Sequence, residues 1–248
     1  MQLIQGWYAI LDGKEVKEKP LGIKRLGKDL VVWRDLDSNV IIMDDRCPHR
    51  MAKLSLGEVK TYKDSSSCVV CPFHGFEFDS EGKCTFVPET KAAAPNLRVA
   101  KYFTKEAYGF IWLWWGDSEP TNSIPWFEGL SDKDFPENSY AQFEETWPVH
   151  FSRSVENQLD YAHLPFVHKN TIGSEIDPSL PREMELEADF MRVYMDKEQE
   201  KPPQKGYFEF RFPNIWQLAI TEKFKIVMAF VPIDEGHTKL YQRNYRLF

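Results

Sequence analysis

The sequence predicts an α+β protein of two domains, an all-β domain followed by an antiparallel sheet that carries one helix. Short β-rich segments separated by turn residues fill the first part of the chain. A stretch rich in Pro, Ser, Asn and acidic residues then suggests an extended connector. After it, one helical pattern is followed by several long β-rich segments. The expected boundaries are 1–118, 119–139 and 140–248.

The strands of the first domain are predicted from β-branched and aromatic runs that end at turn residues. Residues 80–83, Ser-Glu-Gly-Lys, are expected to form a hairpin turn. A strongly aromatic strand ends at Gly116-Asp117. The predicted strands are 23–25, 30–34, 40–43, 77–79, 84–87 and 108–115.

In the second domain, residues 151–163 alternate apolar and polar positions at helical spacing, with Ser152 available as the N-cap. Pro165 is expected to end this helix at Leu164, because proline disfavours helical geometry in the preceding residue. The remainder is expected to form long antiparallel strands. These are 142–149, 183–195, 206–212, 216–221, 224–231 and 239–248.

Composition restricts the classes of function. The chain has 248 residues, 42% of them hydrophobic, and a net charge of −7, which argues against nucleic-acid binding because phosphates require a basic surface. The amino terminus lacks the pattern of a signal peptide, and no apolar run is long enough to cross a bilayer. We expect a cytoplasmic protein, in which four cysteines indicate metal or redox chemistry before disulfides.

The first candidate site consists of two loops that each offer one thiol and one imidazole. Cys47 and His49 frame the first loop, and Cys71 and His74 frame the second loop 24 residues further on. Two cysteines and two histidines are the ligands of a Rieske [2Fe-2S] cluster, in which neutral imidazoles raise the reduction potential. The prolines after the two cysteines stiffen loops whose backbone amides could donate to the sulfurs.

Two simpler interpretations of these residues remain open. Cys47, Cys68, Cys71 and His74 could instead build a zinc site, because Cys68 and Cys71 have zinc-knuckle spacing. Coincidence is the other alternative. The paired spacing favours the Rieske cluster, with Cys68 and Cys84 as small buried residues.

The second candidate site lies where the predicted helix ends. Asn157, Asp160 and His163 recur every three residues and therefore share one helical stripe. A turn at Pro165 could bring His168 beside His163, and two histidines suit Fe(II) with positions left open for O2 and substrate. Asp160 could orient a histidine. The alternative is an ordinary polar stripe with one capping histidine.

These motifs resemble the large (alpha) subunit of Rieske-type non-heme iron ring-hydroxylating oxygenases. The resemblance rests on Cys47-Pro48-His49-Arg50, on residues 71–76, on the strand 109–114, and on Asn-x2-Asp-x2-His-x4-His. It implies a Rieske domain followed by a helix-grip catalytic domain. It also implies a [2Fe-2S] cluster, a mononuclear non-heme Fe(II) bound by His163 and His168, and a catalytic role for Asp160 with Asn157. Asp160 would carry electrons across the interface of a homotrimer.

The resemblance further implies a reaction and partners. Electrons from NAD(P)H would arrive through a reductase, directly or by way of a ferredoxin. O2 would then be used to hydroxylate or oxidatively demethylate a small apolar or aromatic substrate. Phe166, Phe210, Phe212, Trp216 and Phe224 are candidate pocket residues, although core packing is their commoner role. The alternative is an electron-transfer protein with a non-catalytic second domain.

The sequence departs from this family pattern in one respect. The third iron ligand of the family is an aspartate on a helix downstream of the sheet, and no such helix is predicted. None of Asp177, Asp189, Asp196 and Asp234 is assigned to that role. We therefore expect a catalytic domain that is partial, in a chain cut short at its carboxyl end.

Overall fold

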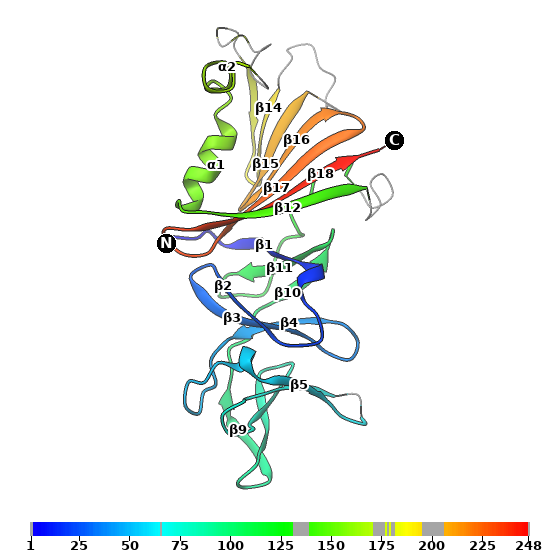
Figure 1. Cartoon of the computed structure of the whole chain (residues 1–248), viewed down its shortest axis with the longest axis vertical. Coiled ribbons are helices and arrows are strands. Elements are labelled where there is room, and N and C mark those ends of the chain that lie inside the picture. Colours follow the sequence, from blue (N-terminus) through cyan, green and yellow to red (C-terminus); the bar gives the residue numbers. More distant parts are fainter. Residues whose placement is uncertain are drawn as a thin grey trace. The chain divides into compact units, whose positions relative to one another are not determined.

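The computed structural model describes residues 2–64, 66–130, 139–170, 177, 179, 182–194 and 206–247. The chain divides into two compact units, residues 1–124 and 125–248 (Figure 1). The division falls inside the predicted connector 119–139. Within the described residues, no helix is long and apolar enough to cross a membrane.

The first unit consists of small antiparallel sheets. Leu26 and Gly27 connect two of its strands with φ angles of 54° and 75°, as a two-residue hairpin turn with the right twist requires. The expected strand 30–34 therefore begins two residues earlier, at Lys28. One sheet has the order β1 (Gly6–Asp12), β11 (Phe110–Trp115), β10 (Thr104–Ala107), and another has β2 (Leu21–Arg25), β3 (Lys28–Arg34), β4 (Val40–Asp44).

The third sheet carries the second of the two candidate ligand loops. Its strands, in order, are β5 (Glu58–Thr61), β6 (Ser67–Val70), β7 (Glu77–Asp79), β8 (Lys83–Val87) and β9 (Ala92–Arg98). The predicted hairpin is present, because β7 pairs with β8 around Gly82, whose φ is 72°. Two short 3-10 helices, Gly13–Glu15 and Leu54–Leu56, complete the unit.

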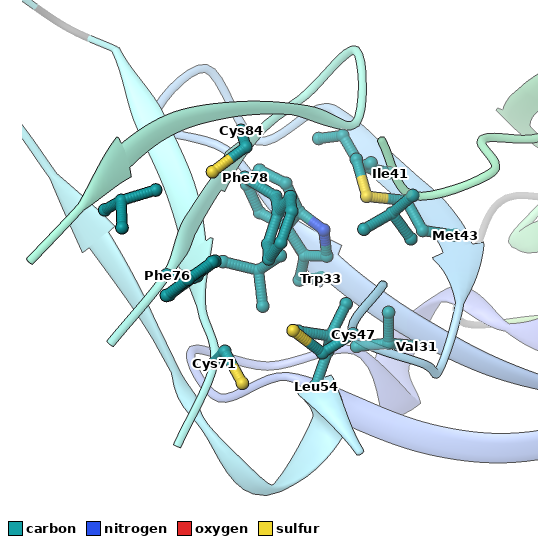
Figure 2. Packing of buried hydrophobic residues seen from close by; sticks show 13 residues of the cluster. Val31, Trp33, Ile41, Met43, Cys47, Leu54, Cys71, Phe76, Phe78 and Cys84 are labelled. Carbon is teal, nitrogen blue, oxygen red and sulfur yellow. The ribbon is translucent and has the colours of Figure 1, made fainter. Parts of the chain in front are cut away.

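One buried cluster joins the last two of these sheets. Trp33 and Val31 of β3 contribute to it together with Phe78 of β7. Figure 2 shows Cys47 and Cys71 at one end of this cluster, whereas Cys84 lies at the other end. The core therefore holds the two candidate thiols at its edge, where the ligand loops leave the sheets.

The second unit contains a seven-stranded antiparallel sheet. The expected single strand 183–195 is wrong, because the backbone N–H of Glu187 donates to the carbonyl of Phe190 and folds the segment into a hairpin. The end of that expected strand, Met195, lies outside the described residues. The order is β12 (Tyr140–Trp147), β18 (Thr238–Arg246), β17 (Phe224–Pro232), β16 (Ile215–Thr221), β15 (Tyr207–Arg211), β14 (Phe190–Tyr194), β13 (Glu183–Leu186).

Helix α1 (Phe151–Leu159) packs against one face of this sheet (Figure 1). Its Val155 and Leu159 contact the apolar cluster that Phe208, Trp216 and Phe230 form with neighbouring strand residues. The N-cap is His150 rather than Ser152, since the His150 side chain accepts from the backbone N–H of Ser152.

The predicted helix 151–163 is too long at its carboxyl end. Asp160 leaves the helical region with ψ 90°, and its side chain accepts from the backbone N–H of Ala162 at 2.9 Å. Such a local bond competes with helix continuation. Pro165 does not end a helix but lies in the first turn of α2 (Leu164–Val167), where its missing N–H has no intrahelical partner in any case.

Candidate functional site

The first ligand loop follows β4 and closes on itself by two backbone hydrogen bonds. The N–H of Cys47 donates to the carbonyl of Ala52 at 2.8 Å, and the N–H of Met51 donates to the carbonyl of Cys47 at 2.8 Å. Cys47 is buried, whereas His49 at the tip is exposed. The loop therefore holds a thiol inside the domain and an imidazole at its surface.

The second ligand loop, between β6 and β7, repeats this arrangement. The N–H of Cys71 donates to the carbonyl of Phe76 at 2.8 Å, and the N–H of Gly75 donates to the carbonyl of Cys71 at 2.9 Å. In both loops, the cysteine N–H donates to the carbonyl five residues later, and the cysteine carbonyl accepts from the N–H four residues later. Two loops of different sequence thus adopt one geometry and present equivalent ligands, Cys47 with His49 and Cys71 with His74.

Both loops turn through a left-handed residue at the same position, Met51 with φ 61° and Gly75 with φ 72°. A Cβ at Gly75 would lie 3.1 Å from Cγ of Pro88. Gly75→Ala is therefore expected to lower the free energy of unfolding by about 1–2 kcal/mol, because of the left-handed backbone and this close contact. Urea denaturation of the two proteins measures the difference, and Met51→Gly is the matched control, which should not destabilise. If Gly75→Ala and the parent have equal free energies of unfolding, position 75 does not require a glycine.

The two thiols of these loops lie next to each other. Burial, together with the neighbouring Cys71, raises the pKa of the Cys47 thiol to about 11, although the backbone N–H groups of His49 and Arg50 donate to its sulfur and lower the pKa. The amide-to-sulfur hydrogen bonds expected from the sequence are thus present in the first loop. Hydrogen bonds of this kind tune the reduction potential of a bound cluster.

The other two cysteines take no part in this group. The Cys68 sulfur lies 3.5 Å from Oγ1 of Thr85, and the Cys84 thiol donates to the carbonyl of Phe86 at 3.6 Å. Among the described residues, no three His, Cys, Asp or Glu side chains converge to hold a single metal ion. Cys68, which the zinc alternative requires beside Cys47, Cys71 and His74, contacts Thr85 instead.

The two imidazoles of the loops also form a pair. The ring centroids of His49 and His74 are 4.9 Å apart, and the His49 ring stacks on Phe76 of the opposite loop with centroids 4.6 Å apart. Two thiols on the inside and two imidazoles on the outside fit a [2Fe-2S] cluster, which takes two protein ligands at each iron.

The second site brings His163 and His168 together across α2. Their ring centroids are 5.5 Å apart, as the turn at Pro165 leads one to expect. His163 occupies the N-cap position of α2 and His168 its C-cap position. A pair of neighbouring imidazoles of this kind can hold Fe(II), which prefers two histidines and one carboxylate.

Asp160 lies beside this pair, whereas Asn157 does not join it. The Asp160 carboxylate is 3.5 Å from Nδ1 of His163, so it can orient that ring. Asn157 is an exposed residue in the last turn of α1. The single stripe expected for these residues is wrong, because the chain leaves the helix at Asp160.

The aspartates that follow His168 in the sequence, which were considered as a third iron ligand, have other partners in the structure. Asp177 accepts from Ser179, Asp189 lies 3.8 Å from Arg211, and Asp234 lies 2.9 Å from His237. Asp196 lies outside the described residues. None of the three described acids belongs to a group that could hold a metal ion.

Two known families match this chain. The Rieske [2Fe-2S] domain family matches residues 6–103, and the vanillate O-demethylase oxygenase C-terminal domain family matches residues 147–218. The first match spans both ligand loops, and the second spans α1, α2 and the paired histidines. Together they define a protein that combines an iron–sulfur domain with part of an oxygenase domain.

Individual proteins show the same combination. The chain is 31% identical over 192 residues to the vanillate O-demethylase oxygenase subunit of Pseudomonas sp., covering 77% of this chain and 52% of that protein. It is 35% identical over 155 residues to methylxanthine N1-demethylase NdmA of Pseudomonas putida, covering 62% and 42%. The fold is similar to that of dicamba monooxygenase, with a TM-score of 0.78 at 23% identity over 97% of this chain and 77% of that one.

The chain therefore carries a Rieske [2Fe-2S] domain followed by a segment similar to an oxygenase C-terminal domain, and the relatives named above are Rieske oxygenases. It spans about half the length, or less, of the curated relatives it matches. The Rieske domain implies a [2Fe-2S] cluster, and its two pairs of ligands fit that cluster.

Proposed function

We propose that this protein is the oxygen-activating component of a Rieske oxygenase system, which hydroxylates or oxidatively demethylates a small apolar or aromatic molecule. One observation carries the proposal. A domain with a full set of Rieske ligands is followed by a helix turn that pairs His163 with His168 5.5 Å apart, next to Asp160.

Each group of residues has a distinct part in this activity. Cys47, Cys71, His49 and His74 would hold the [2Fe-2S] cluster, and His163 with His168 would hold mononuclear Fe(II). The cluster would supply electrons one at a time, and the mononuclear iron would activate O2. Exposed His49 offers the donor a short route to the cluster. Asp160 would orient His163 by accepting a hydrogen bond from its Nδ1–H, which would leave Nε2 free for iron.

The names of the relatives suggest the class of substrate. Three of them are named for vanillate, for methylxanthine and, in a system of Comamonas testosteroni, for toluene-4-sulfonate, whereas two others are named for a methylsterol and for chlorophyllide. The first three are small rings with polar substituents. Of the expected pocket aromatics, Phe210 and Trp216 are buried beneath α1 and Phe166 is 69% exposed. We propose Trp216 as a substrate contact, because its indole N–H is buried without a hydrogen-bond partner.

The proposal also covers the redox partners, the oligomeric state and the location of the protein. NAD(P)H electrons would arrive from a reductase, directly or through a ferredoxin, to a homotrimer in the cytoplasm. In a trimer, Asp160 of one subunit would meet the Rieske domain of the next. Domain limits of 1–118 and 140–248, joined by the connector, complete the proposed organisation.

A second candidate is an electron-transfer protein whose second domain only docks partners. The observation in its favour is that no carboxylate among the described residues joins His163 and His168 as a third ligand. Substrate-dependent O2 consumption separates the two candidates. The carrier would transfer electrons without consuming O2 in response to any substrate.

The test is metal and sulfide analysis of anaerobically purified protein, with ultraviolet–visible and EPR spectra before and after dithionite. For an oxygenase we expect about three irons and two sulfides per chain. O2 uptake with a reductase and a panel of aromatic acids and methylxanthines then tests turnover. About two irons with two sulfides and no O2 uptake would favour the electron carrier. A colourless protein without sulfide would contradict both.

A further inference from the structure

A buried carboxylate lies close to the first cysteine ligand and has no part in the function proposed above. Asp45 directly follows β4 and is only 5% exposed. Two peptide units separate it from Cys47, so the two Cα atoms are at most about 7 Å apart. Because burial of a carboxylate costs free energy unless other groups stabilise it, the hydrogen bonds of Asp45 indicate what it does.

Asp45 binds Ser55, at the other end of the first ligand loop, through both of its carboxylate oxygens. The backbone N–H of Ser55 donates to Oδ1 at 2.7 Å, and the Ser55 hydroxyl donates to Oδ2 at 2.6 Å. The backbone N–H of Asp45 donates to the carbonyl of Asp29, which fixes the residue to β3. These bonds close residues 46–54, which carry both ligands of the first loop, at their base. The pair Asp45 and Ser55 is called the loop clamp below.

The loop clamp is packed closely against the rest of the domain. A Cβ on Gly22 of β2 would lie 2.6 Å from Oγ of Ser55, so a glycine is needed for β2 to come this near. Leu54, the residue before Ser55, belongs to the same buried cluster as Cys47 (Figure 2). A displacement of Ser55 would therefore disturb the core around the thiol ligand.

The two ligand loops differ in how the buried carboxylate next to each is compensated. Glu77 follows the second loop and is 4% exposed, but Nζ of Lys60 donates to it at 2.8 Å. Both donors to Asp45 are neutral groups. Arg46, its neighbour in the sequence, is exposed and donates from Nε to the sulfur of Met51. Asp45 therefore carries a negative charge that its own hydrogen-bond donors do not neutralise.

We propose that Asp45 is a positioning residue of the iron–sulfur cluster. Through Ser55 it keeps the first ligand loop closed, and its buried charge lowers the reduction potential of the cluster. The inference rests on the proposed function, because it concerns the cluster that is assigned there to the two loops. Reduction adds an electron to the cluster, and a fixed negative charge nearby opposes that addition. A weaker loop clamp allows the loop to open more often, so that iron is lost faster.

Asp45→Asn tests the charge, because the amide oxygen can still accept from Ser55. At an ambient potential near the midpoint of the parent, the ratio of reduced to oxidised cluster should be about three- to tenfold higher in the variant. At about 59 mV per tenfold, this is an upward shift of about 30 to 60 mV. A redox titration of the cluster-loaded full chain, followed by EPR, measures it. Asp37→Asn is the matched control, since it makes the same change at an exposed position beyond the other end of β4 and should leave the potential unchanged.

Ser55→Ala tests the loop clamp, because it keeps the charge and removes one hydrogen bond. Release of iron from the reduced cluster to an excess of a ferrous chelator is followed by the loss of cluster absorbance. The rate should be about three- to tenfold higher than in the parent. Ser66→Ala is the matched control. The Ser66 hydroxyl also donates to an aspartate, Asp64, at 2.7 Å, but on an exposed turn outside both ligand loops.

The outcomes separate this inference from the proposed function. Absence of a Rieske EPR signal in the parent protein would mean that the proposed function has failed. With an intact signal, an unchanged potential in Asp45→Asn, or an equal shift in Asp37→Asn, would overturn the role of the charge. If Asp45→Asn binds no cluster, Ser55→Ala decides alone. Faster iron release from Ser55→Ala than from Ser66→Ala supports the loop clamp, and equal rates overturn it.

Discussion

His74→Cys should lower the reduction potential of the cluster by roughly 100 mV or more while the cluster remains bound. A thiolate in place of one imidazole on the outer iron adds negative charge, and clusters with four cysteines lie at about −400 mV against about −150 to +300 mV for Rieske centres. Cysteine is smaller than histidine and so fits beside Phe73, whose ring centroid lies 4.2 Å from that of His74. A redox titration followed by EPR measures the shift.

The matched control is a cysteine that holds no iron. Cys84 lies at the far end of the buried cluster, with its thiol on the carbonyl of Phe86 (Figure 2). Cys84→Ser should leave the potential and the EPR spectrum unchanged. If His74→Cys also leaves the potential unchanged, His74 is not a ligand.

Asp160→Asn should leave iron and sulfide content unchanged but slow electron transfer between the two metal centres about 10- to 100-fold. The amide oxygen of asparagine can still accept from the N–H of Ala162, so the turn after α1 remains. What is lost is the negative charge 3.5 Å from Nδ1 of His163. Single-turnover kinetics with a pre-reduced cluster measure the rate.

The chain offers a close control for this change. Asp234 lies 2.9 Å from Nδ1 of His237 at the same spacing of three residues, on the turn between β17 and β18. Asp234→Asn removes the same charge from a similar pair without altering the proposed iron site. Equal slowing in both variants, or none in Asp160→Asn, would show that Asp160 has no bridging role.

Much of the fold follows from local sequence signals. The six strands predicted for the first unit and the hairpin at Gly82 are present, because turn residues separate β-branched and aromatic runs. The sequence did not predict β1, β5, β6, β9 and β10. The break at Glu187 was not predictable, since the segment has no glycine or proline there. Pairing of Met184 with Val193 in the sheet determines that hairpin.

The second unit also contains a buried charge pair that its sequence did not reveal. Arg192 and Glu209 are 8% and 1% exposed and lie 2.8 Å apart on neighbouring strands. The two residues are 17 positions apart in the sequence. A charged residue in a strand normally indicates the solvent face, and only a partner across the sheet allows it to be buried.

The sequence by itself determined which side chains form the candidate sites. Ligand chemistry depends on residue type, and the short separations within Cys47–His49, Cys71–His74 and His163–His168 restrict the possible geometry to a few loops. Only the tertiary structure decided that the first two loops share one hydrogen-bond pattern and meet, with Met51 in the left-handed region. It also decided that the helix ends before Asp160. These features arise from pairing between distant strands and from one side-chain hydrogen bond, and neither leaves a periodic signal along the chain.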